Sequence, residues 1–137
     1  MKFDKGINKK YRKSIDDAFQ TILAKGDKFH KFVAKNILES QMIICVFPVS
    51  KVNASGISGV TNPTLANERI LSERLDLDEA FKEVFITFAE ETIDNGGQRG
   101  CEGTLVHEGC HAYDFARAIA SFSNADNEKP FNPTLYE

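Results

Sequence analysis

Residues 104–114, TLVHEGCHAYD, lie in a stretch whose periodicity predicts an α-helix from about residue 103 or 104 to residue 122. His107, His111 and Asp114 fall on one side of this helix. An opposite arc of about 100° holds apolar and small residues, and such a face suits close packing against a sheet or another helix. The residues of this face are Leu105, Gly109, Ala112, Ala116, Ile119 and Ala120. The histidines therefore lie outside the stripe that is expected to face the core.

Within this helix, His107, Glu108 and His111 form the pattern H-E-x-x-H. Histidines four residues apart lie about 40° apart around a helix and one turn apart along it, so both imidazoles can reach one metal ion. Glu108 lies about 100° from His107, beside the metal, where it can take a proton from a metal-bound water. The pattern predicts a Zn²⁺ cofactor, His107 and His111 as metal ligands, and Glu108 as the catalytic general base.

The segment HEGCHAYD (107–114) resembles the active-site helix of the zincin metallopeptidases, in which a third ligand and a water complete a tetrahedral zinc site. The resemblance implies an α+β fold, with N-terminal helices and a small sheet packed on the HExxH helix. It also implies zinc-dependent hydrolysis of a peptide or protein substrate by a metal-activated water. Zincins hold the substrate in extended form along an edge strand. The candidate for that strand is 83–89, with a plain core strand or helix as the alternative.

The resemblance narrows the choice of a third zinc ligand. The metzincin pattern would place glycine at position 114 and a ligand at position 117, where this chain has Asp114 and Arg117. The gluzincin pattern instead uses a glutamate some twenty or more residues after the motif. Glu128 lies in a loop-like stretch, whereas Glu137 follows a proline-containing stretch that is typical of a helix start. Glu137 is therefore the preferred third metal ligand.

Asp114 is a competing candidate, because it lies on the same helix face as His107. The helix rise places it about 10.5 Å along the axis from His107, which is too far for one straight helix to close a tetrahedral site. We expect Asp114 to act as a hydrogen-bond acceptor that holds the ring of His111 or a neighbouring group. If neither residue binds zinc, the ligand lies beyond residue 137, or the chain is a catalytically weak or inactive zincin-like binding module or toxin fragment.

The rest of the chain predicts a mixture of helices and strands. Amphipathic helices are expected over 9–25 and 28–40, a buried strand over 42–49, partly helical structure over 68–82, and a strand over 83–89. Loops are expected over 51–67 and 94–100. In the second helix the expected apolar face comprises Phe29, Phe32, Val33 and Ile37, with Lys28, Lys31 and Lys35 mostly on the other side.

Length and composition are typical of one soluble globular domain. The 137 residues suit a single metallopeptidase-like domain, 1–137, which the position of Glu137 suggests is truncated at its C-terminus. The net charge of −3 gives no electrostatic indication of nucleic-acid or anionic-membrane binding, and no apolar run is long enough for a membrane span. The opening MKFDKGINKK is not a secretory signal, so we expect a cytoplasmic protein or one secreted after removal of a leader.

Overall fold

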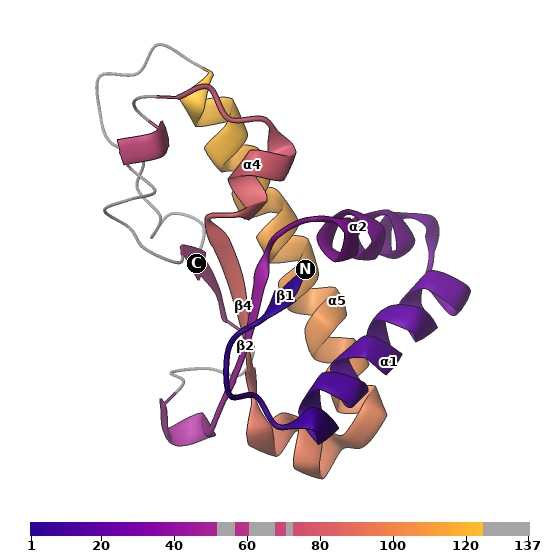
Figure 1. Ribbon diagram of the computed structural model, residues 1–137. Helices are drawn as coiled ribbons and strands as arrows, with labels where there is room; N and C mark the ends of the chain where they lie inside the picture. The colour runs from indigo at the N-terminus through magenta and orange to yellow at the C-terminus, as the bar shows by residue number, and fades with distance from the viewer. Residues whose placement is uncertain (52–56, 61–67, 71–72, 125–137) are drawn as a thin grey trace.

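The computed structural model describes residues 1–51, 57–60, 68–70 and 73–124. They form an α+β fold of N-terminal helices, a small sheet and a long C-terminal helix that packs on both (Figure 1). The elements in chain order are β1 (Lys2–Phe3), α1 (Lys9–Lys25), α2 (Lys28–Glu39), β2 (Ile43–Phe47), the 3₁₀ turn η1 (Val49–Lys51), β3 (Ile57–Val60), α4 (Leu77–Phe81), β4 (Val84–Ala89) and α5 (Glu90–Ser123). This arrangement confirms the expected α+β class and the expected helices and strands over 9–25, 28–40, 42–49 and 83–89, to within a few residues at each end.

The sheet has the strand order β1-β2-β4-β3. Strands β1, β2 and β4 are parallel, and β3 runs antiparallel to β4. Helices α1 and α2 connect β1 to β2, and with α5 they lie on one side of the sheet (Figure 1). The sheet therefore presents β3 as one of its two edges, and α5 follows directly from the neighbouring strand β4.

Two expectations about the strands are wrong. The segment 83–89 does form a strand, but β4 lies between β2 and β3 and is not an edge strand. Five of its six residues are buried, as is typical of a central strand. Part of the expected loop 51–67 is the strand β3, whose short sequence ISGV contains a serine and a glycine and so gives only a weak strand signal. The remaining residues 52–56 and 61–67 lie outside the described part of the chain.

The buried face of α2 is narrower than its apolar pattern predicts. Val33, Ala34 and Ile37 are buried, whereas Phe29 and Phe32 are 50% and 49% exposed. Phe32 lies about 140° around the helix from Ile37, so both cannot face the same core. The expected apolar face is therefore buried only in part, and Phe29 and Phe32 are half exposed.

Helix α5 contains a break at Gly97, whose backbone has φ 57° and ψ −148°. The expected loop 94–100 is therefore wrong, because the residues on both sides of Gly97 are helical. A positive φ with this ψ is accessible essentially to glycine alone, so Gly97 allows one helical segment to end and the next to begin without a loop. The hydroxyl of Tyr11 in α1 donates to the Asp94 carboxylate at 2.8 Å and ties the first segment to the N-terminal helices.

Gly100 marks the closest approach between the two segments of α5. A Cβ atom at this position would lie 2.7 Å from the main-chain oxygen of Thr92, so the backbone would have to shift. We expect Gly100→Ala to lower the free energy of unfolding by about 1–3 kcal/mol. The matched control is Gly103→Ala in the same helix, where nothing lies within 4 Å. This change should raise stability by about 0.5–1 kcal/mol. Urea denaturation of both variants tests the pair, and equal stabilities would contradict the close approach.

Candidate active site

The second segment of α5 positions the HExxH motif by packing its apolar face against the rest of the fold. Leu105, Ala112 and Ile119 on this face are buried. At Gly109, a Cβ atom would lie only 3.4 Å from Ile37 and 3.7 Å from Val33, so α2 crosses α5 at the motif itself. The expected core-facing stripe is confirmed, and it turns the opposite side of the helix toward solvent.

His107 and His111 lie side by side on that opposite side. Their ring centroids are 4.8 Å apart, with an angle of 81° between the ring planes. Both residues are exposed. Two imidazoles that bind one tetrahedral metal through nitrogen at about 2.0–2.1 Å hold their centroids about 5 Å apart. The observed centroid separation is close to that value, so the two rings are near enough to share one metal ion.

Glu108 contrasts with the two histidines because its side chain is buried. The residue is 9% exposed, and its Oε1 atom lies 3.7 Å from Nε2 of His107. The helix places it about 100° from His107, at the border between the buried face and the histidine face. A largely buried carboxyl group beside two exposed imidazoles is suited to exchange a proton with a molecule that is bound at the histidines.

Asp114 lies on the outer surface, one turn beyond His111. Its carboxylate is 3.9 Å from the guanidinium of Arg117, and both side chains are about two-thirds exposed. Within the described residues, Asp114 forms no hydrogen bond with His111. The expected orienting role of Asp114 thus remains a prediction. Arg117 in turn lies over the ring of Tyr113 at 5.6 Å.

A third metal ligand is not found in the described residues, among which no group of three or more His, Cys, Asp or Glu side chains could hold a metal ion. Glu137 and Glu128 lie outside these residues, so their predicted roles are not tested by geometry. The residues that are present supply the donor chemistry for two zinc ligands and one base.

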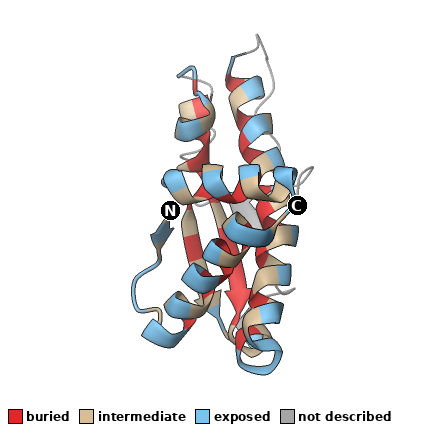
Figure 2. Cartoon of the chain, turned by 90° about the vertical axis from the view of Figure 1, so that its right-hand side faces the viewer, coloured by how far each residue is buried: buried red, intermediate tan, exposed pale blue. Residues whose placement is uncertain are grey.

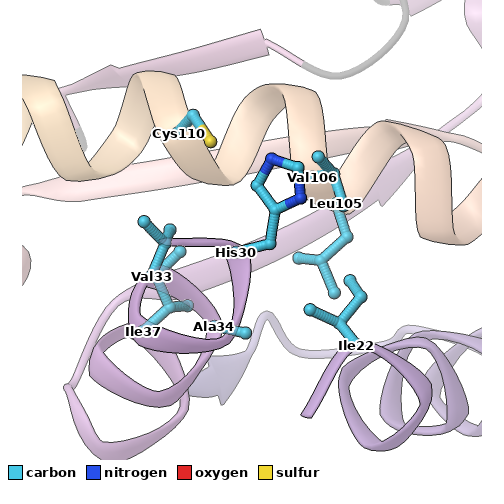
Figure 3. Close-up of a pocket in the computed structure, with 8 residues that line it drawn as sticks. All are labelled: Ile22, His30, Val33, Ala34, Ile37, Leu105, Val106 and Cys110. Atoms are coloured by element: carbon cyan, nitrogen blue, oxygen red, sulfur yellow. The ribbon is translucent and has the colours of Figure 1, made fainter. Parts of the chain in front are cut away.

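His30 and Cys110 were not part of the predicted site, and the structure brings them to one small apolar cavity between α1, α2 and α5 (Figure 3). The cavity measures about 10 Å³, which is room for roughly one water molecule. His30 pairs with Asp27 at 3.2 Å, and burial raises the pKa of the Cys110 thiol. Cys110 therefore lines the cavity beside α2.

Comparisons of the chain with models of protein families, with curated proteins and with solved structures find no match. Among the described residues, no helix has the length and apolar character needed to cross a membrane. The function must therefore be argued from the site itself.

Proposed function

We propose that this chain is a zinc-dependent peptidase of zincin type, with the gluzincin ligand pattern. His107, Glu108 and His111 would form the active site at which it hydrolyses the peptide bonds of its substrate. One observation carries the proposal. The two imidazoles lie side by side and exposed at a separation that fits one tetrahedral metal, and a buried carboxyl group lies next to them.

The arrangement of the sheet supports the zincin fold. In zincins the edge strand holds an extended substrate, and here the edge beside β4 is the antiparallel strand β3. One side of β3 pairs with β4, so its other side is the one along which a peptide could add as a further strand. Helix α5, which carries the motif, also contacts β3.

The side chains divide the chemistry between them. His107 and His111 would hold the zinc ion through one nitrogen each. When bound, zinc supplies Lewis acidity, which polarises a carbonyl group and lowers the pKa of water. Glu108 accepts a proton from the attacking water and passes it to the leaving amine. Its burial keeps the carboxyl group close to the histidines and limits its exchange with bulk solvent.

The length of chain that follows α5 favours Glu137 as the third ligand. Outside the described residues, the carboxylates are Asp126, Glu128 and Glu137, with no histidine or cysteine. The rise of α5 places Asn124 about 20 Å along the axis from His111. Glu128 lies four residues after Asn124 and can extend at most about 14 Å, whereas thirteen residues extend more than 40 Å. Glu137 can therefore return to the histidines easily, whereas Glu128 could reach them only with a nearly fully extended chain and side chain.

A second candidate function is a zincin-like module that binds metal weakly and does not cut. The observation that favours it is the lack of a third ligand among the described residues. A hydrolysis assay separates the two candidates. We expect the zinc-loaded chain to cleave a fluorescently labelled unfolded protein, to stop after chelation, and to recover when zinc is returned. Zinc binding without any cleavage would support the binding module instead.

A further inference from the structure

The outer surface of α2 carries exposed phenylalanines among lysines, a feature that the catalytic proposal does not use. Phe29 and Phe32 are half exposed. Lys28 and Lys35 lie within about 60° of Phe32 around the helix, and Lys31 lies on the same outward side. We call this surface, made by Lys28, Phe29, Lys31, Phe32 and Lys35, the α2 outer face.

The lysines of the α2 outer face have no ion pair with any residue that the structure describes. Two acidic residues belong to the same helix region. Asp27 is engaged with the N-terminus of α2 and with His30, and Glu39 lies about 10 Å along the axis from Phe32. Three lysines of α2 without an ion pair to any described residue therefore lie on the same side of the helix as the exposed phenylalanines, although the chain as a whole has a net charge of −3.

Both phenylalanines pack against an aromatic ring of α5. The ring of Tyr113 in α5 makes edge contacts with Phe29 and Phe32 at centroid distances of 6.4 and 5.6 Å. Neither phenylalanine lines the cavity between α1, α2 and α5 or the groove beside α4 and α5. Figure 2 looks at this side, and α2 lies across the front of the molecule. The α2 outer face is thus an exposed helix surface of mixed aromatic and basic character, which suits the interface of an anionic lipid bilayer.

We propose that the α2 outer face binds the surface of an anionic lipid bilayer. Aromatic side chains on a basic helix surface insert at the boundary between headgroups and acyl chains, and each nearby lysine adds electrostatic attraction to anionic lipids. The net charge of the chain does not predict this affinity, because it takes no account of where the charges lie. The lysines form a basic surface only once α2 has folded and packed. α2 crosses α5 at Gly109, about 160° around the helix from His107, so a chain bound in this way keeps the histidines open to solvent.

The test is co-sedimentation of the full chain with vesicles of phosphatidylcholine alone or with about 30% phosphatidylserine. We expect at least about tenfold more binding to the anionic vesicles at low salt, and weaker binding as salt rises. Lys28→Glu with Lys35→Glu should remove this preference. The matched control, Lys5→Glu with Lys9→Glu, changes the net charge by the same amount at exposed lysines elsewhere and should keep most of the binding.

Phe32→Ala should weaken binding at every salt concentration, because it removes the inserted side chain, and circular dichroism checks that it still folds. Equal binding to both vesicle types, no binding at low salt, or equal loss in the two lysine variants would overturn the proposal. The first two outcomes would leave a polypeptide partner as the alternative occupant of this surface. None of these results depends on whether the chain hydrolyses peptides.

Discussion

Replacing Glu108 with glutamine is expected to lower the kcat of peptide hydrolysis by about 10²–10⁴-fold, which is the usual contribution of a positioned acid–base group. The amide has nearly the same shape as the carboxylate but cannot accept a proton from water. Because Glu108 is buried beside His107 and is not itself a ligand in this account, zinc content should stay unchanged. The measurement is the rate of cleavage of a labelled peptide, together with the zinc bound per chain.

Glu102→Gln is the matched control for this prediction. It makes the same chemical change on α5, about one and a half turns before the motif, and should leave kcat within about twofold. A Glu108→Gln enzyme with full activity would remove Glu108 from the role of base. Loss of activity accompanied by loss of zinc would instead make Glu108 a residue that supports the metal site.

The second large effect concerns the third zinc ligand. Glu137→Ala should lower zinc affinity by more than about 100-fold, whereas Asp114→Asn should lower it by at most the 10–100-fold that is typical of a group hydrogen-bonded to a ligand. The structure places Asp114 beside Arg117 on the surface, so this loss is the largest that we expect for Asp114→Asn. Competition with a fluorescent zinc chelator measures both affinities.

Glu128→Ala serves as the control for Glu137→Ala, since Glu128 could reach the histidines only with a nearly fully extended chain. A larger loss in Asp114→Asn than in Glu137→Ala would make Asp114 the ligand and would require α5 to bend near the motif. A negligible loss of zinc affinity in both Asp114→Asn and Glu137→Ala would contradict the proposal that this chain supplies a gluzincin-type third ligand.

The sequence predicts those features of the fold that depend on residues close together along the chain. The spacing of apolar residues places α1, α2 and the motif part of α5, and the four-residue spacing of His107 and His111 accounts for their adjacent rings. These features follow from helix geometry alone. For the same reason, the position of Glu108 beside His107 could be predicted without a structure.

Most features that differ from the sequence-based predictions depend on contacts between distant segments, and one depends on the backbone of a single glycine. The run Val84–Ala89 has the chemistry of a strand, but only the pairing of β2 and β3 on its two sides shows that it is central. The outward position of Phe32 depends on which face of α2 meets α5. The turn-forming sequence around Gly97 is helical on both sides, because one positive φ is enough to separate the two segments.

Whether His107 and His111 bind one zinc ion can be read from the zinc content of the purified chain after loading and dialysis. We expect one tightly held zinc per chain, and its loss in a His107→Ala, His111→Ala double variant that still folds. A chain that retains no zinc after loading, or a double variant that retains as much as the unmodified chain, would show that the two histidines do not form a zinc site.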